Sequence, residues 1–519
     1  MPAPASPRMR LVWVAVAATG GGVGYLAFPG IGLWPAGMMA IAALMCAVDR
    51  LGSAMGYLAA CTFALTLFGP LLWWSAIAAG VWPWALLVAM TMSLVGLVGL
   101  AWPWVRRLPG IRRSRVLGAV AFAAIWAGVE ELRAVVPLGG FPWGRLAFAQ
   151  ADSPMAHLAW LGGAPLTSFA VAFAGALLAG TAAHLRLGRT WAACGAAGLA
   201  VAVVVGPAAI GLDARSERGS MRVAAIQGGG EGDVLPEGVT RGRAVFDLHA
   251  RLTEDVARQR GRGGVDVVLW PEDSVAFDLG AHREVVEELA ALAGAVGAPL
   301  LVGSTEYPTD TERYNVSLLI DDEGRILDRY AKRHPVPFGE YMPWRSLARR
   351  VTAAADRVTW ETLPGDEVGI VDLPVARTGE AVAIGEIICF EVAYDSLVRE
   401  AVAGGAQLVA VQTNNASFGT SAESEQQLAM SRLRAIEHGR SIIHISTTGA
   451  SAVISPAGIV LDAAPAHTPA AMVDTVPLRT SLTPATRHGR TVGWGISALG
   501  GGLFVVGAIH SLGRTRRRS

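Results

Sequence analysis

Residues VDVVLWPE (265–272) form a run of apolar and β-branched side chains that ends in tryptophan, proline and glutamate. Similar runs recur before and after it, at MRVAAIQ, PLLVGST, YNVSLLID, GRILDRYAK, AVAIGEIICFE, AQLVAVQTN and SIIHIST. Stretches with helical spacing of apolar residues separate several of them, at 241–260, 284–296 and 423–438. Strands that alternate with helices in this way indicate an α/β domain with buried sheet strands. The charged part of the chain is long enough for one large domain with its own core.

Outside this segment the composition changes. The whole chain has 519 residues, of which 52% are hydrophobic and only 16% charged, and its mean hydropathy is +0.42. Soluble globular proteins average about 25% charged residues, so this balance indicates a membrane protein. The deficit of charge is concentrated in residues 1–212, which contain four acidic residues and twelve arginines. The formal net charge of +1 excludes an overall basic nucleic-acid-binding protein and an acidic disordered chain.

Eight apolar stretches are candidates for membrane spans, seven before the α/β segment and one after it. They are 11–28, 33–48, 51–77, 84–105, 116–129, 158–185, 191–212 and 492–509. We therefore expect a multi-pass α-helical membrane domain over residues 1–212, an α/β domain over 213–490, and a C-terminal membrane helix with a basic tail over 491–519. The first stretch has the composition of a signal peptide, but its continuation into further spans favours an uncleaved anchor.

The distribution of arginines predicts how these spans are oriented. With the N-terminus in the cytoplasm, the arginine-rich segments 106–115, 186–189 and 514–518 all fall on the cytoplasmic side, as the positive-inside rule requires. Seven spans then place residues 213–490 outside the cytoplasm. Twelve of the sixteen tryptophans precede residue 213, many of them near span ends, and membrane-interface belts account for them without a cofactor.

Reactive side chains stand near the ends of three expected strands: Glu272, Lys332 and Cys389. Strand ends and the loops after them are where α/β domains place their sites. Acyl transfer needs a nucleophile, a base to ionise it and a positive group for the oxyanion, and these three side chains can supply all three. Lys332 is the only lysine among 43 lysines and arginines. Because lysine is a compact point charge and arginine a wide fork, this lysine marks a position where the difference matters.

The cysteines have a simpler alternative reading. Cys46, Cys61 and Cys194 lie in apolar runs, where a small buried hydrophobe is the ordinary interpretation, and a cysteine such as Cys389 in an apolar strand is also more often an inert core residue. The chain contains no CxxC motif and no regularly spaced cysteine pairs. We therefore expect neither a disulfide framework nor a metal site.

Four motifs together carry a resemblance to a known family: WPED (270–273), YAKRHPVPFGEYMP (330–343), ICFE (388–391) and TNNASFG (413–419). They resemble the Glu-Lys-Cys pattern of the nitrilase superfamily. The VPFGEYMP form of the lysine loop, set between seven spans and a last one, resembles the apolipoprotein N-acyltransferase family over essentially the whole chain. The resemblance implies a nitrilase-like α-β-β-α sandwich beside the membrane helices.

The same resemblance implies roles for individual residues. Glu272 would be the general base, Lys332 the partner of the oxyanion and Cys389 the nucleophile. The supporting or substrate-binding positions that it implies are Glu340, Phe390, Glu391, Asn414, Phe418 and Trp143. The last of these lies in GFPW (140–143), which resembles a loop of the family's membrane part and is equally compatible with an interfacial aromatic turn.

The function that the resemblance implies is N-acylation of lipoproteins. A fatty acyl chain would pass from a phospholipid, through a thioester on Cys389, to the N-terminal amine of a diacylglyceryl-cysteine apolipoprotein. The enzyme would be a monomer in the bacterial plasma (inner) membrane, with its catalytic domain on the periplasmic or outer face. Its partners would be membrane lipids and apolipoproteins, with no cofactor, metal or nucleic acid.

Two alternatives from other classes remain. A membrane-tethered nitrilase-type amidase would use the same three groups and pass the acyl group to water, but a soluble substrate does not require eight spans. A non-catalytic reading makes the outer domain the binding module of a receptor or transporter. The scarcity of ionisable residues in the membrane half, with no evident ion path, disfavours a transporter.

Overall fold

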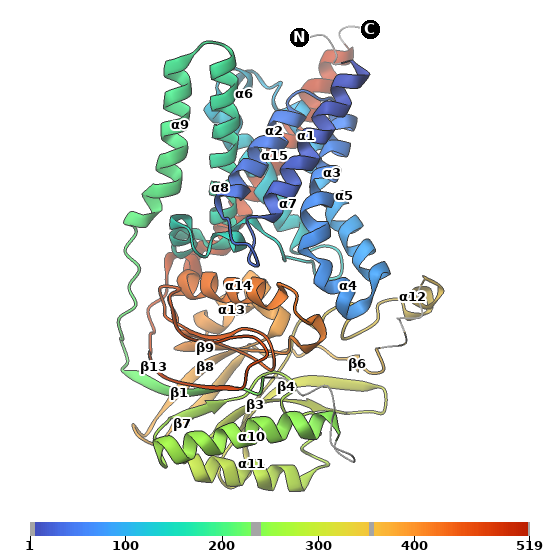
Figure 1. Ribbon diagram of the computed structural model, residues 1–519. Helices are drawn as coiled ribbons and strands as arrows, with labels where there is room; N and C mark the ends of the chain where they lie inside the picture. Colours follow the sequence, from blue (N-terminus) through green and yellow to red (C-terminus); the bar gives the residue numbers. More distant parts are fainter. Residues whose placement is uncertain (1–5, 230–239, 352–355, 357, 517–519) are drawn as a thin grey trace. The chain divides into compact units, whose positions relative to one another are not determined.

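The computed structural model describes residues 6–229, 240–351, 356 and 358–516 (Figure 1). Its contacts divide the chain into two compact units. The first, which we call the helical unit, comprises Met1–Ala76, Val81–Gly211 and Arg487–Ser519. The second, which we call the α/β unit, comprises Ile77–Gly80 and Leu212–Thr486.

The helical unit is built from apolar helices, most of them joined by short connections. These helices are α1 (Pro7–Tyr25), α2 (Pro35–Val48), α3 (Ser53–Leu71), the first part of α4 (Trp73–Ala79), α5 (Val81–Val105), α6 (Pro109–Arg113), α7 (Arg115–Arg133), α8 (Leu158–Arg186), α9 (Thr190–Val205) and most of α15 (Pro484–Arg516). Helices α3 and α5 meet backbone to backbone at Gly56 and Gly99. A Cβ atom placed on Gly99 would lie only 1.9 Å from the carbonyl oxygen of Gly56, so only glycine permits this crossing. Small residues at crossings are typical of membrane helices, which associate by close packing.

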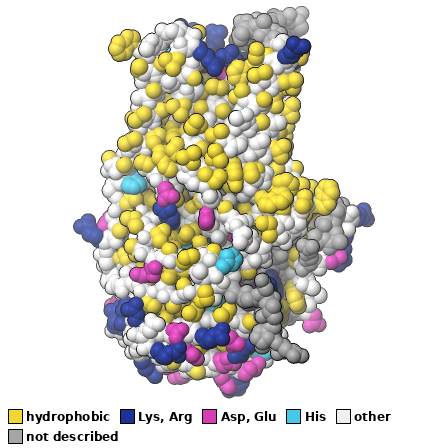
Figure 2. Space-filling model, in the orientation of Figure 1, with side chains coloured by type: hydrophobic (Ala, Val, Ile, Leu, Met, Phe, Trp, Pro, Cys, Tyr) yellow, Lys and Arg dark blue, Asp and Glu magenta, His cyan; other side chains and the backbone are white. Residues whose placement is uncertain are grey.

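Among the described residues, five helical segments are long and apolar enough to cross a bilayer, fewer than the eight spans expected. They are Ser53–Leu71, Val81–Val105, Pro154–Arg186, Thr190–Ala209 and Pro484–Ser511. Figure 2 shows hydrophobic side chains over most of the visible face of the helical unit, with Lys and Arg side chains at its upper end, and most of the visible Asp and Glu side chains over the α/β unit. Apolar helix surface that no protein covers is what contact with lipid requires.

The other three expected spans also lie on helices, but each has a feature that lowers its hydropathy or length. Helix α2 has 14 residues, about 21 Å at 1.5 Å per residue, which is short of a ~30 Å hydrocarbon core. Helix α1 begins with two arginines and contains four glycines. Helix α7 carries two arginines and two glutamates near its ends. Helices therefore form in all of the expected stretches. Fewer than eight of them are long and apolar enough to count as membrane spans among the described residues.

Two mixed sheets form the centre of the α/β unit. The first has the order β13-β1-β2-β3-β4-β5, with β6 paired to β4, and the second has the order β12-β11-β10-β9-β8-β7. The strands are β1 (Ser220–Gln227), β2 (Val267–Leu269), β3 (Leu300–Glu306), β4 (Glu312–Ile320), β5 (Ile326–Ala331), β6 (Glu361–Thr362), β7 (Ile370–Val375), β8 (Glu380–Ile388), β9 (Leu408–Thr413), β10 (Ile442–Ser446), β11 (Ser451–Ile454), β12 (Val460–Ala464) and β13 (Ala470–Pro477). The strands β1, β2 and β3 run parallel, as do β8, β9 and β10, and the remaining pairs of the two ladders are antiparallel apart from β4 with β6.

Helices cover the outer faces of both sheets. Helices α10 (Arg241–Arg260) and α11 (Arg283–Val296) lie on the first sheet, and α13 (Asp395–Ala403) and α14 (Glu423–His438) lie on the second (Figure 1). Because strand side chains alternate between faces, Val223 packs into the core between the sheets while Ala224 packs under α10 and α11. The layers are helix, sheet, sheet and helix, which confirms the expected α/β fold class.

The strands differ from the expectation at the two ends that concern the site. Strand β2 ends at Leu269, so Glu272 lies in the following loop rather than at the strand end. Strand β8 ends at Ile388, and Cys389 starts a turn of 3₁₀ helix, Cys389–Ala393, with φ of +55°. The strands β6, β7, β11, β12 and β13 were not expected, because they are short or carry exposed and polar residues.

Candidate active site

Loops from both sheets supply the side chains of the site. Glu272 follows β2 and Lys332 follows β5, both in the first sheet, whereas Cys389 follows β8 and Asn414 follows β9 in the second. Glu340 lies eight residues beyond Lys332, in the loop after β5. Strands β2 and β5 run in the same direction within the first sheet, as do β8 and β9 within the second. Strands of one direction have their carboxyl ends at the same edge of a sheet, which is why residues far apart in sequence converge there.

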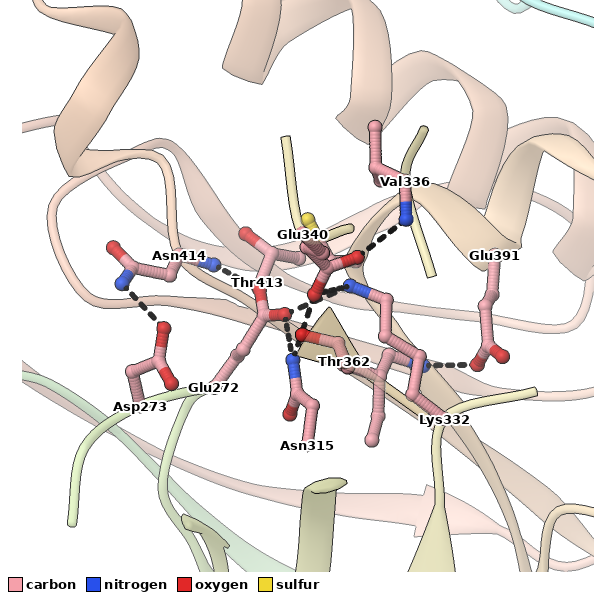
Figure 3. Close-up of polar contacts among 12 residues, drawn as sticks. Glu272, Asp273, Asn315, Lys332, Val336, Glu340, Thr362, Glu391, Thr413 and Asn414 are labelled. Carbon is pink, nitrogen blue, oxygen red and sulfur yellow. Dashed lines mark hydrogen bonds and ion pairs between the residues drawn. The ribbon is translucent and has the colours of Figure 1, made fainter. Parts of the chain in front are cut away.

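Lys332 is held between two carboxylates. Its Nζ donates to Oε1 of Glu272 at 3.0 Å and to Oε1 of Glu340 at 2.9 Å. The Nδ2 of Asn315 donates to the same two oxygens, at 2.7 Å and 3.2 Å. Figure 3 shows the four side chains pointing toward one another, with Asn315 and Lys332 as two bridges between the glutamates. The Oε2 of Glu272 accepts from the backbone N–H of Asn414 at 2.9 Å, which fixes the carboxylate plane.

Burial and charge set the protonation of this cluster. The side chain of Lys332 is 1% exposed; burial opposes its charge, but the carboxylates of Glu272 and Glu340 outweigh burial and hold the pKa of the ammonium well above its usual range. Burial raises the pKa of Glu272, although Lys332 pulls it back. Burial also opposes ionisation of Glu340, but Lys332 and the N–H of Val336 (2.7 Å from Oε2) bring its pKa below the ordinary value. Lys332 is therefore charged, Glu340 is ionised, and Glu272 is the more basic carboxylate.

Cys389 adopts a backbone conformation that few non-glycine residues adopt. Its φ of +55° turns the chain abruptly after β8, and such positions persist only where the surrounding structure enforces them. Burial, followed by the negative charge of Glu272, raises the pKa of the thiol well above its usual value, and Lys332 opposes that rise. The resting sulfur is therefore a thiol. The Nε2 of Gln427 lies 3.6 Å from Sγ.

Glu391 joins the cysteine turn to the lysine loop. Its carboxylate accepts from the backbone N–H of Ile388 at 2.9 Å, of Arg333 at 2.7 Å and of His334 at 3.1 Å. It also accepts from the hydroxyl of Tyr330 at 3.0 Å. These contacts tie the segment before Cys389 to the segments on both sides of Lys332, so the expected support by Glu391 takes the form of a buried anchor between the two loops.

The remaining expected residues lie in different surroundings. Phe390 is buried with its ring edge-on to Tyr394, 5.7 Å between centroids. Asn414 also donates from Nδ2 to Asp273 at 3.0 Å, and Phe418 lies in the short 3₁₀ turn that follows it. Trp143 belongs to the helical unit, where it is 1% exposed and its ring packs 5.1 Å from that of Trp74. The described contacts of Trp143 are thus those of a core aromatic residue.

Several buried amides of the site were not expected from the sequence. Asn315 lies in β4, and its backbone carbonyl accepts from the N–H of Lys332 at 2.9 Å, so the pairing of β4 with the end of β5 brings it to the cluster. Asn415 lies within the quoted motif TNNASFG but was not singled out there, and Gln427 lies outside the quoted motifs. Their amides bond to each other at 3.0 Å, and the Nε2 of Gln427 lies 3.6 Å from Sγ of Cys389. No quoted motif contains Asn315 or Gln427; the signal for Asn315 is a polar amide within an otherwise apolar run of strand residues. In the part of the chain that the structure describes, no group of three His, Cys, Asp or Glu side chains is arranged to hold a metal ion.

Comparison with known proteins agrees with this architecture. The family model for the apolipoprotein N-acyltransferase N-terminal domain matches residues 20–177, and the carbon-nitrogen hydrolase model matches residues 222–481. An apolipoprotein N-acyltransferase of Mycolicibacterium smegmatis is 34% identical over an alignment that covers 95% of this chain and 85% of the relative. One from Pseudomonas aeruginosa is 31% identical, covering 78% of this chain and 76% of the relative.

Among solved structures, an amidase of the nitrilase superfamily from Nesterenkonia is 20% identical, with a TM-score of 0.38, and covers 53% of this chain and 97% of its own. The two family models together span both units, and the bacterial relatives align across them. The chain therefore belongs to the apolipoprotein N-acyltransferase family and contains a carbon-nitrogen hydrolase domain.

Proposed function

We propose that this protein transfers a fatty acyl chain from a membrane phospholipid to the N-terminal amine of a diacylglyceryl-cysteine lipoprotein, through a thioester on Cys389. The observation that carries the proposal is the buried contact of Lys332 with both Glu272 and Glu340 at the loops that also position Cys389. Two further observations support the proposal: the chain belongs to this family, and it contains apolar helices long enough to cross a membrane. Both proposed substrates carry lipid chains and would reach the enzyme within a membrane.

The first half-reaction forms the thioester. Glu272 takes the proton of the Cys389 thiol as Sγ attacks the ester carbonyl carbon, and the carbonyl electrons move onto oxygen. Lys332 donates two of its three N–H groups to the two glutamates, and its third faces the oxyanion; one such donor contributes roughly 3–4 kcal/mol. The tetrahedral adduct then expels the glycerol oxygen, which takes the proton from Glu272. A lysophospholipid leaves and the acyl group stays on sulfur.

The second half-reaction uses the same groups in the reverse order. Glu272 takes a proton from the lipoprotein's neutral α-amine as the nitrogen attacks the thioester carbon. The new oxyanion again meets Lys332, and the adduct collapses with the thiolate as leaving group. The thiolate recovers a proton from Glu272, which completes a ping-pong cycle. In this scheme Glu340 and Asn315 hold Lys332 in place and do not react.

The proposed location is the bacterial plasma membrane, with the α/β unit on the periplasmic or outer face. Within the helical unit, Asp49 at the end of α2 lies 3.4 Å from Arg106 beyond α5 and 3.9 Å from Arg115 at the start of α7. The arginine-rich segment between α5 and α7 thus shares one end of the helical unit with the turn after α2. That grouping of positive charge supports an orientation with this end in the cytoplasm.

A lipid-transfer assay tests the proposal. Purified protein in vesicles with an acyl-labelled phospholipid and a diacylglyceryl-cysteine peptide should yield the N-acylated peptide and lysophospholipid. Without the peptide, mass spectrometry should find the acyl group on Cys389, and Cys389→Ala should lose both products. Release of free fatty acid with no acylated peptide would instead support the membrane-tethered amidase, and no turnover by the wild type would refute both enzymes.

A further inference from the structure

Two side-chain amides form a chain of hydrogen bonds that ends at the sulfur of Cys389: Asn415 contacts Gln427, and Gln427 contacts the sulfur. Gln427 projects from helix α14, and Asn415 lies in the loop between β9 and that helix. Gln427 is completely buried and Asn415 nearly so. Neither belongs to the cluster formed by Glu272, Lys332 and Glu340, and neither has been given a role in the transfer.

The amide of Asn415 has both of its ends occupied. Its Nδ2 donates to Oε2 of Glu423 at 2.7 Å and to Oε1 of Gln427 at 3.0 Å. Its Oδ1 accepts from the hydroxyls of Thr413 at 2.6 Å and Ser446 at 2.5 Å. The hydroxyl oxygen of Ser446 also accepts from the backbone N–H of Gly449 at 2.8 Å, and its hydrogen is donated to Oδ1 of Asn415. The orientation of this amide is therefore set by its partners.

This orientation determines which end of Gln427 faces the sulfur. Because the Oε1 of Gln427 accepts from Asn415, its Nε2 is directed toward Sγ of Cys389, at 3.6 Å. An N–H group placed at sulfur stabilises a thiolate more than a thiol, because hydrogen bonds to charged acceptors are the stronger ones. Lys332 is the only other group described above that favours the charged form of this sulfur, and it is bound by two carboxylates.

We propose that Gln427 is a further catalytic residue, an N–H donor that stabilises the Cys389 thiolate, and that Asn415 is the positioning residue that turns this donor toward the sulfur. The same donor acts on the thiolate as it attacks the ester and again as it leaves the thioester. The inference rests on the proposed function for its place in the cycle, but the thiolate itself can be measured without any lipid.

The test is the pH dependence of Cys389 alkylation by iodoacetamide, in which the thiolate displaces iodide, followed by mass spectrometry of the peptide that contains Cys389. Gln427→Leu should shift the midpoint upward by about one pH unit or more, and should lower the acyl-transfer kcat roughly ten-fold with little change in KM. Asn415→Ala should shift the midpoint in the same direction by less. Gln227→Leu is the matched control, since that buried amide in β1 bonds to Ser451, Pro465 and Thr468 instead.

Gln427→Glu provides a second variant of nearly the same shape, in case the leucine variant does not fold. It places a carboxylic oxygen where the N–H stood and should also shift the midpoint upward. A wild-type midpoint in either folded variant, or an equal shift in Gln227→Leu, would overturn the proposal. If the wild type transferred no acyl group while Gln427→Leu still shifted the midpoint, the proposed function would fail and the donor role of Gln427 would stand.

Discussion

The Nζ of Lys332 lies 3.0 Å from Oε1 of Glu272, and both side chains are almost completely removed from solvent, with exposures of 1% and 5%. An ion pair taken out of water is costly unless its remaining hydrogen-bonding groups are satisfied. Here Glu340 accepts a second hydrogen bond from Lys332, and Asn315 donates one to Glu272, which together provide that compensation. The contact links the two groups that the proposed mechanism uses for proton transfer and for charge stabilisation. A change in the charge or position of either group therefore alters the pKa of the other.

Replacing Lys332 by arginine tests whether a compact charge is required. Lys332→Arg keeps the charge, but its wide planar fork does not fit between two buried carboxylates with one N–H left for the oxyanion. Since a misplacement of about 1 Å can cost 10²-fold, we expect at least that loss in kcat. The readout is acyl transfer by purified protein of unchanged melting temperature.

The adjacent Arg333 offers a matched control. Its guanidinium pairs with Glu400 at 2.7 Å in a partly exposed position, so Arg333→Lys should keep activity within about two-fold. Near-normal turnover of Lys332→Arg would show that the lysine acts only as a general positive charge, and the oxyanion role assigned to it would be withdrawn.

Asn315 should control the acid limb of the activity profile. Its Nδ2 donates to the ionised form of Glu272, so Asn315→Leu removes a bond that favours the carboxylate. The pKa of Glu272, already raised by burial, should rise further, and the base should be lost at higher pH than in the wild type. We expect the acid limb of kcat/KM to move upward by roughly one pH unit. An unchanged acid limb in a folded variant would mean that Glu272 is not the group that titrates there.

Glu423 should make stability depend on pH. Burial raises the pKa of its carboxyl from 4.5 to about 8, so the folded protein holds the neutral acid where the unfolded chain is already ionised. The free energy of unfolding therefore falls as pH rises from 4.5 to about 8, because the unfolded chain releases this proton and the folded protein keeps it. Above that range both states are ionised, and the loss of stability stays constant. Glu423→Gln removes the ionisation and can still accept from Asn415. Its gain in stability over the wild type should therefore grow with pH through this window, reaching at most about 4–5 kcal/mol.

The same substitution two residues further along α14 is the control. Glu425 is exposed, so Glu425→Gln should show no pH-dependent gain. Apparent melting temperatures in detergent, measured from pH 5 to pH 9, give the comparison. A gain in Glu423→Gln that is equal at both ends of this range would show that the carboxyl titrates normally in the folded protein.

The proposed orientation is tested by fusions of alkaline phosphatase, which is active only outside the cytoplasm. A fusion after Gly219, just before β1, should be active, whereas one after Arg113, in the arginine-rich segment between α5 and α7, should be inactive. The reverse pattern would place the α/β unit in the cytoplasm and exclude lipoprotein N-acylation at that location.

Local patterns in the sequence were sufficient for the long elements. The spacing of apolar residues predicted α14 with the bounds that the structure has, 423–438, and placed β1 and α10 equally well. Short polar strands escaped prediction because their stability comes from a neighbour: β13 is held by pairing with β1, from Ser220 opposite Pro477 to Gln227 opposite Ala470. A strand that owes its existence to a partner more than two hundred residues away has little signature of its own.

The membrane half shows the same division. Each of the eight apolar stretches that hydropathy marked as a span contains helix, and the stretch 51–77 is divided between α3 and α4. A helix satisfies its own backbone hydrogen bonds and needs only an apolar surface to enter lipid. Whether an apolar stretch is long enough to span a membrane depends on the residues at which its helix begins and ends, and hydropathy alone does not give these. Within the residues that the structure describes, five segments have the required length and hydropathy, and α2 is too short.

At the candidate site, the chemistry of acyl transfer restricts which side chains can serve, and this was enough to name Glu272, Lys332 and Cys389. Glu340 was named through the resemblance of the lysine loop to a known family. The tertiary structure alone decided what surrounds them. Asn315 reaches two glutamates through the register of β4 with β5 in the first sheet. Gln427 reaches the sulfur of Cys389 from helix α14, which packs on the second sheet. Such contacts join segments far apart in the chain, and their geometry depends on sheet order and loop path, which no local pattern of side chains encodes.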